Sequence, residues 1–407
     1  MPLASSSSVG FKFKKEAVFG TVVNGTACNA LRIAGESLDY AIKTDTSKEI
    51  RADRQISDLI ITGAEASGGF TFELSYGEFD PFLEAVLEGT YAVFGTNGVS
   101  AVIPTSATFA ANTLTAGAAT TGVNLFTNLV LGQWVLIQGS TNPLQNIWAQ
   151  VSTTIPPTNT VLTFQGSPFT GATGTGGAAV TVSGSRVSNG TTQRSYTLEK
   201  NFSDVAQTLT YTGMTADKLS LKIASGSILG GSIDFKGKSA TSQVGSLLGT
   251  TTASTAFNVM NAVNDVSSVL ENGSALVGTY IKSLSLDVMN NLRGQDGVGV
   301  LGNASVASGN VQVSGSVEFY FADNTLYNKF LNNTASSLSI RVDDGSNNGY
   351  VITIPKIKYS GGKITAGGIN QDVMVSMSYT GLFDPTTGKT IIIDRAGVAV
   401  LPTTPVN

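Results

Sequence analysis

The stretch of sequence that decides the fold is "SGGFTFELSYGEFDPFLEAVLEG", which runs from Ser67 to Gly89. Its first half alternates with a period of two, so Phe70, Phe72 and Leu74 lie on one face of a strand. Its second half reads as a helix, with Asp80 as N-cap, Pro81 in the first helical position and Gly89 at the end. Five apolar residues fall on one helical stripe, and we expect them to be core: Phe79, Phe82, Leu83, Val86 and Leu87.

Nearly the same pattern returns in "SGSVEFYFADNTLYNKFLNN", from Ser314 to Asn333. The expected strand residues of this copy are Val317, Phe319 and Phe321, and the expected helix stripe is Leu326, Tyr327, Phe330 and Leu331. A similar closing strand follows each copy, "GGSIDFKG" at 230–237 and "VMVSMSYTG" at 373–381. Chance similarity would explain one shared motif, but the shared order of strand, helix and closing strand favours a duplicated unit.

A segment without charge separates the two copies. No charged side chain occurs between Gly89 and Ser185, and both tryptophans, Trp134 and Trp148, lie in this segment. The shift in composition predicts a small all-β domain inserted into the first unit at residues 96–193. The tryptophans could stack on a sugar, but the favoured reading is that they form the core of this domain, which needs large apolar anchors. Removing the insert should leave any assembly of the rest intact.

The expected fold class is mainly β with minor helix. Two tandem β-sandwich or barrel units each carry one flanking helix, and a small all-β domain is inserted. The expected division is an N-terminal arm at 1–28, a first unit at 29–95 and 194–237, the insert at 96–193, a connector at 238–277, a second unit at 278–397 and a C-terminal tail at 398–407. The most charged stretch, 48–58, alternates in sign and predicts a solvent face or a subunit contact.

Composition argues against several classes of function. The chain has 407 residues, a net charge of −4 and no histidine. A histidine-based triad or metal site is therefore impossible, and we expect no catalytic residues, no metal and no cofactor. The single Cys28 cannot form a disulfide within one chain. We expect neither Sec-type export nor membrane insertion, because the N-terminus lacks a signal-like apolar run and no stretch of about 18 apolar residues exists.

The ordered set of segments resembles the tail tube protein of long-tailed, non-contractile bacteriophages. The segments are "KKEAVFGT", "GESL" and "EIRADRQISDL", then the two strand–helix units, and finally "FDPTTGKTIIIDR". The resemblance implies a structural virion protein, assembled in the host bacterial cytoplasm, whose stacked rings form a hollow tube that conducts DNA. The duplication implies rings of three chains with pseudo-sixfold symmetry. The insert should then lie outside the tube, because it would block the lumen.

The same resemblance implies which proteins the chain binds and which surface lines the tube. The chain would bind other copies of itself and tail proteins such as the tape measure, terminator and distal tail proteins, and viral DNA would pass without specific binding. Lysine and arginine on the wall would hold phosphates, so a neutral or acidic lumen is expected. The candidate lumen acids are Glu73, Asp234 and Glu318, and the candidate ring strands carry Phe70, Phe72, Leu74, Val317, Phe319 and Phe321.

One alternative stays open from the sequence: a surface adhesin or carbohydrate-binding β-sandwich. It would explain the tryptophan-bearing insert but not the duplicated strand–helix unit. A hydrolase with paired carboxylates is disfavoured, because no recognisable carboxylate motif occurs.

Overall fold

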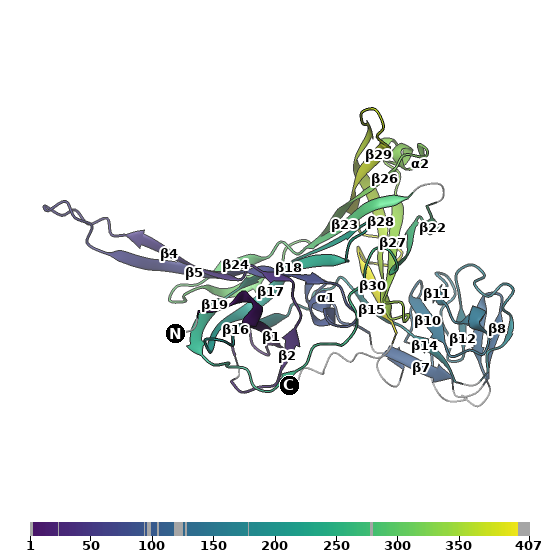
Figure 1. Cartoon of the computed structure of the whole chain (residues 1–407), viewed down its shortest axis with the longest axis horizontal. Coiled ribbons are helices and arrows are strands. Elements are labelled where there is room, and N and C mark those ends of the chain that lie inside the picture. Colours follow the sequence, from purple (N-terminus) through teal and green to yellow (C-terminus); the bar gives the residue numbers. More distant parts are fainter. Residues whose placement is uncertain are drawn as a thin grey trace.

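The computed structural model describes residues 3–22, 24–92, 94–95, 99–103, 106–117, 125–126, 128–177, 179–276 and 280–397. Strands dominate this part of the chain, and its two α-helices are short, α1 (Asp80–Val86) and α2 (Thr325–Leu331). The prediction of a mainly β protein with minor helix is confirmed. Figure 1 shows a central body with a long hairpin at one end and a separate small β-domain at the other.

The first repeated unit contains strands that pair in the order β4–β5–β18–β17–β16–β1. Their bounds are β1 (Val9–Lys15), β4 (Asp39–Thr46), β5 (Leu59–Glu73), β16 (Ser195–Phe202), β17 (Gln207–Ala224) and β18 (Gly230–Gly237). Shorter strands extend the unit: β2 (Cys28–Leu31) beside β1, β3 (Gly35–Glu36) beside β5, β19 (Ser239–Val244) beside β17, and β20 (Thr251–Thr252) beside β2. A 3-10 turn, η1 (Ser6–Ser8), precedes β1.

The second unit repeats this order of pairing as β23–β26–β29–β28–β27–β21. Its strands are β21 (Val266–Glu271), β23 (Ile281–Met289), β26 (Gln312–Tyr320), β27 (Ser336–Asp343), β28 (Gly349–Ala366), β29 (Val373–Gly381) and β30 (Ile392–Ala396), with β22 (Ser274–Ala275) beside β21 and the hairpin β24 (Arg293–Asp296)–β25 (Asn303–Ala307). A register shift in β17 between Ala216 and Lys218 recurs in β28 between Tyr359 and Gly361. Shared irregularities of this kind support a duplication.

The two units join edge to edge in one sheet. Residues 218–224 of β17 pair antiparallel with residues 283–289 of β23. A continuous sheet therefore runs β4–β5–β18–β17–β23–β26–β29–β28, and we call it the long sheet. Its apolar face packs into a core that both units share, with Phe70, Leu286 and Phe319 among its members. The two units are consequently parts of one folded body and not independent domains joined by a linker.

The helix stripes differ between the two units. All five expected residues of the first stripe are buried: Phe79, Phe82, Leu83, Val86 and Leu87. In α2, Leu326 is buried and Phe330 packs partly buried on the core, with the Tyr327 ring beside it at 5.9 Å between centroids. Leu331 is 60% exposed, so its assignment to the core is wrong. Figure 1 shows α2 at an outer end of the body.

The cap assignment for α1 is also wrong. Asp80 is the first helical residue, Phe79 occupies the N-cap position, and no side chain caps the helix. Asp80 is 1% exposed. Its carboxylate is instead engaged by residues of the second unit, which are described below.

The described residues of the expected insert form two sheets and a hydrophobic core of their own, and we keep the name insert for them. One sheet has the order β11–β10–β14–β7–β6 and the other has the order β12–β9–β8–β13. The elements are β6 (Phe94–Gly95), β7 (Val99–Ile103), β8 (Ala107–Ala110), β9 (Thr113–Ala116), β10 (Trp134–Gln138), η3 (Pro143–Gln145), β11 (Trp148–Gln150), β12 (Val161–Thr163), β13 (Gly174–Thr175) and β14 (Val180–Ser183). Buried members of its core run from Phe94 to Val182.

Three expected boundaries need correction. Residues 9–15 of the expected N-terminal arm form β1, because their apolar side, including Phe13, is buried in the core. The expected connector 238–277 supplies β19 to the first unit and β21 to the second. The strand β15 (Ser185–Ser188) pairs with β30, so it belongs to the body and not to the insert. The expected tail, 398–407, lies outside the described residues.

Candidate functional site: the long sheet, its edges and the seat of the insert

The polar face of the long sheet brings the three candidate acids together. Phe70 of β5 lies opposite Ile233 of β18, and both are in the core. Asp234 follows Ile233 on β18, so its side chain points to the polar face of the sheet. Glu73 follows buried Phe72, and Glu318 lies between buried Val317 and Phe319. Strand alternation therefore places all three carboxylates on the face opposite the shared core. This grouping follows from the register, which the sequence did not supply.

Two cations of this polar face are held in ion pairs. Lys218 Nζ lies 3.2 Å from Asp287 Oδ1, and Lys236 Nζ lies 3.5 Å from Glu65 Oε1. The Asp287 carboxylate also accepts a hydrogen bond from the Ser220 hydroxyl at 2.5 Å. Pairing neutralises these charges locally, and serine hydroxyls such as Ser285 and Ser316, 2.9 Å apart, occupy much of the remaining surface. Two further lysines of the described residues, Lys222 and Lys363, are exposed on this face, and they lie apart on β17 and β28.

The long sheet ends in two open edges. In the described residues, β3 and β4 pair with β5 on one side, and no strand pairs with their other side. Residues 361–366 of β28 pair only with β29. Glu36, Asp39 and Lys363 are exposed at these edges. Open strand edges favour pairing with another chain. The candidate ring strands β5 and β26 lie inside the sheet, and Phe321 lies one residue beyond β26, partly buried.

A long hairpin built from β4 and β5 projects from the body (Figure 1). Its tip includes the charged stretch 48–58, in which Arg51 and Asp53 form an ion pair at 2.8 Å. Hydrogen bonding between them lowers the pKa of Asp53 and raises that of Arg51. The hairpin also exposes six large apolar side chains: Ile42, Ile50, Ile56, Leu59, Ile60 and Ile61. Such a concentration of exposed apolar residues is typical of a contact surface.

A buried ionic cluster fastens the two units together. Asp80 of α1 forms an ion pair with Arg395 of β30, and its Oδ1 accepts a hydrogen bond from the Tyr350 hydroxyl at 2.7 Å. The guanidinium of Arg395 lies over the Tyr91 ring at 4.3 Å from its centroid. Burial lowers the pKa of Arg395, but Asp80 together with Tyr91, Tyr76 and Tyr350 more than offsets burial and holds this pKa above its ordinary value. Burial also raises the pKa of Tyr350 well above 10. The cluster thus holds a charged arginine and a neutral tyrosine around one carboxylate.

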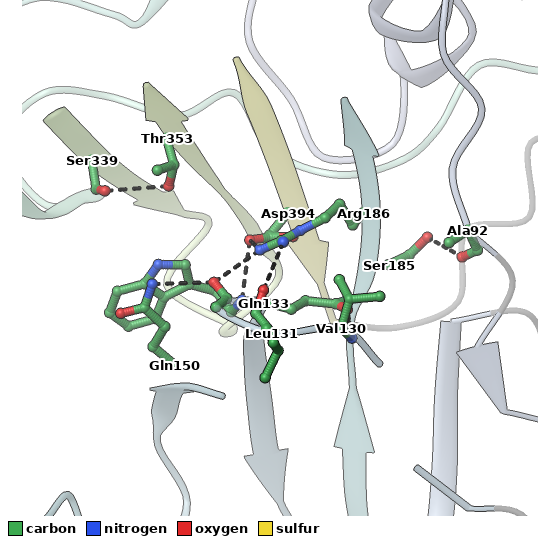
Figure 2. Close-up of polar contacts among 12 residues, drawn as sticks. Ala92, Val130, Leu131, Gln133, Gln150, Ser185, Arg186, Ser339, Thr353 and Asp394 are labelled. Atoms are coloured by element: carbon green, nitrogen blue, oxygen red, sulfur yellow. Dashed lines mark hydrogen bonds and ion pairs between the residues drawn. The ribbon is translucent and has the colours of Figure 1, made fainter. Parts of the chain in front are cut away.

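The insert is seated on the second unit through Arg186 and Asp394 (Figure 2). Arg186 donates from Nε to Asp394 Oδ1 at 2.6 Å and from Nη2 to Oδ2 at 2.8 Å. The same guanidinium donates to the carbonyls of Leu131 at 3.2 Å and Gly132 at 2.9 Å. Asp394, which is fully buried, also accepts from the Trp134 backbone N–H at 3.1 Å. One bidentate pair therefore connects the insert, β15 and β30.

The tryptophans belong to this seat and not to the core of the insert, which corrects the sequence expectation. Trp148 is 9% exposed and packs with Leu136, Val351 and Ala396, and Trp134 packs against the same cluster. Val351 and Ala396 come from the second unit. The sequence offered one signal for this seat, because Arg186 is the first charge after the uncharged segment; the role of Asp394 had no local signal.

The described residues contain neither a metal-binding group nor a membrane-spanning helix. No group of three or more carboxylates or cysteines there is arranged to hold a metal ion. In the same part of the chain, no helix is long and apolar enough to span a membrane.

Comparison with known proteins identifies the family. The family model described as phage tail tube protein matches residues 6–381, which is most of the chain. This is a family of structural virion proteins and not of enzymes. No curated protein matches the chain. The chain therefore belongs to the phage tail tube protein family, as a structural component of the virion.

Proposed function

We propose that this chain forms rings of three copies with pseudo-sixfold symmetry, which stack into the tail tube of a long-tailed, non-contractile phage. The observation that carries the proposal is the long sheet, in which two equivalent units already join through β17 and β23 and leave one open edge at each end. Lateral pairing of these edges removes both from solvent. Each copy supplies two units, so three copies supply six.

The polar face of the long sheet would line the lumen. It carries Glu73, Asp234 and Glu318, and two of its lysines, Lys218 and Lys236, are paired with carboxylates, so it suits a channel through which DNA passes without specific binding. The insert packs on Val351 and Ala396 of the second unit and projects from the body at the end opposite the β4–β5 hairpin, which suits a position on the outside of the tube. Tape measure, terminator and distal tail proteins would meet the ends of the tube, and assembly would take place in the host cytoplasm.

The alternative of a carbohydrate-binding adhesin gains no support. It depended on tryptophans that were free to stack on a sugar. Trp148 is buried, and Trp134 packs against the seat of the insert.

Rings of three copies are the first expected result. Purified chain should form rings or tubes in negative-stain electron micrographs, and the smallest closed species should have three times the chain mass of 42.0 kDa in native mass spectrometry. A chain that stays monomeric at high concentration would contradict ring formation. A ring of six chains would contradict the pseudo-sixfold arrangement of three chains but would leave ring formation itself standing.

The β4–β5 hairpin is expected to contact the next ring in the stack. Replacing residues 47–58 by a two-residue Asn-Gly turn removes the exposed Ile50 and Ile56 and keeps Thr46 opposite Leu59. The variant should form rings but few or no tubes, as read by electron microscopy and sedimentation. Shortening the exposed loop 153–158 of the insert is the matched control and should leave tubes unchanged. Wild-type tube lengths in the hairpin variant would exclude a stacking role.

A further inference from the structure

We propose that the joint between two copies of this chain repeats the joint between its own two units, with residues 361–367 of one copy paired antiparallel to residues 35–41 of the next. The inference rests on the proposed ring assembly and adds to it the strands and the register. The joint within the chain, formed by β17 and β23, serves as the template.

The first strand of the template, β17, has an equivalent in the second unit, β28. Both β17 and β28 are 18 residues long. In each, the N-terminal half pairs with β16 or β27 and the C-terminal half pairs with the closing strand β18 or β29. In β17, the C-terminal half also pairs with β23, on the edge opposite β18. The same edge of β28 is open within the described residues, so it can accept a strand from another copy.

The second strand of the template, β23, has an equivalent in the first unit, residues 35–41. Leu284 of β23 lies opposite Val317, in the strand that precedes α2. Glu36 lies opposite Phe70, in the strand that precedes α1. Phe70 and Val317 are matched by the duplication, so residues 35–41 correspond to residues 283–289. Within the described residues, no strand pairs with the outer edge of residues 35–41. On this edge the Leu38 N–H donates to Glu36 Oε2 at 2.9 Å and the Leu38 carbonyl accepts from the Tyr211 hydroxyl at 3.1 Å. Pairing with a second copy would replace the first of these contacts and share the carbonyl of the second.

The shared register fixes which residues meet. Gly230 lies opposite both Glu73 and Lys222, and Met374 lies opposite both Tyr320 and Thr365. Since Glu73 and Tyr320 are matched by the duplication, Lys222 corresponds to Thr365. Two residues earlier on each strand, Ser220 corresponds to Lys363. Ser220 lies opposite Asp287, whose equivalent is Asp39. Lys363 of one copy therefore falls opposite Asp39 of the next.

Charge and apolar pattern both suit this register. In the template, Asp287 forms an ion pair with Lys218 at 3.2 Å. Asp39 keeps the acid at the equivalent position, and Lys363 supplies a cation on the same face. Both side chains are exposed and form no ion pair within the described chain. One residue further on, Ile364 would lie opposite Leu38.

That neighbouring pair repeats the template on the apolar face, where Leu221 lies opposite Leu286. Leu38 and Ile364 already pack on the shared core. Pairing in this register would therefore continue the apolar row from one copy into the next and keep the charged row on the polar face.

Charge reversal tests the register. Asp39→Lys and Lys363→Asp each place like charges opposite each other across every joint between copies, so each should raise the concentration needed for assembly at least about tenfold. The double variant restores an opposite pair and should return this concentration to within about twofold of wild type. Lys282→Asp, an exposed change on β23 at the joint within the chain, is the matched control and should assemble normally.

The possible outcomes separate the register from the function. All variants should show wild-type circular dichroism and thermal unfolding as unassembled subunits, because the altered side chains are exposed. Single variants that assemble like wild type, or a double variant as defective as the singles, would overturn the register and leave ring assembly standing. Wild-type chain that never forms rings would overturn both.

Discussion

Replacing Arg395 by Met is expected to lower the free energy of unfolding by about 3–5 kcal/mol, the usual loss when one partner of a buried ion pair is removed. Asp80 and Arg395 side chains are 1% and 4% exposed, so the remaining carboxylate would be buried without a cation. Tyr350 would still donate its hydrogen bond at 2.7 Å, but a neutral donor does not replace the guanidinium charge. Urea unfolding of the unassembled subunit measures the loss.

Two further variants isolate the buried charge as the cause. In the double variant Asp80→Leu, Arg395→Met, both charges are gone, and apolar replacement of a buried pair is often close to neutral. Its loss should therefore be clearly smaller than that of Arg395→Met. Asp53→Ala removes an ion pair that is exposed on the hairpin tip and should leave the unfolding midpoint unchanged. A double variant that is less stable than the single would mean that packing, and not charge, dominates at this place.

The cluster also explains why a chain with two units behaves as one body. Asp80 lies on the helix of the first unit, whereas Arg395 and Tyr350 lie on β30 and β28 of the second. The joint at β17 and β23 connects the same two units through backbone hydrogen bonds. Two independent connections fix the angle between the units, and a ring needs that angle to be the same in every copy.

Much of the fold could be predicted because its signals are local and occur twice. Only a few neighbouring residues are needed to recognise the alternation in "FTFEL", the apolar stripe of α1 and the repeated pattern at 314–333. The candidate acids could be named but not placed, since a shift of one residue in register would move them to the other face. The pairing of β4 with β5 and of β5 with β18 supplies that register.

The features that the sequence missed depend on partners far away in the chain. Asp80 looked like a helix cap because Asp before Pro is a common N-cap pattern, and its true partner lies at position 395. Trp134 and Trp148 looked like the core of the insert because the domain is small, but they pack against Val351 and Ala396. A buried seat between two domains has no periodic signature, so only the three-dimensional structure reveals it.

Removal of the insert should leave ring assembly intact only if Arg186 is retained. The ends of the insert meet at Ala92 and Ser185: the Ser185 hydroxyl donates to the Ala92 carbonyl at 2.6 Å, and the Ala92 N–H donates to the Arg186 carbonyl at 2.9 Å. Deleting 93–184 and joining the ends through a short Gly-Ser linker therefore keeps β15 and its pairing with β30. This variant should form rings in electron micrographs at concentrations close to those of the full chain.

A longer deletion, of 93–193, should fail, although the sequence alone suggested that removal of 96–193 is harmless. It removes β15 and Arg186 and leaves Asp394, which is fully buried, without its cation. The expected cost is about 3–5 kcal/mol in unfolding free energy, with loss of the β15–β30 pairing in addition. Arg186→Ala in the full chain serves as the comparison and should show a similar loss by urea unfolding with the insert still present. Equal stability of the two deletions would mean that neither β15 nor the Arg186–Asp394 pair stabilises β30.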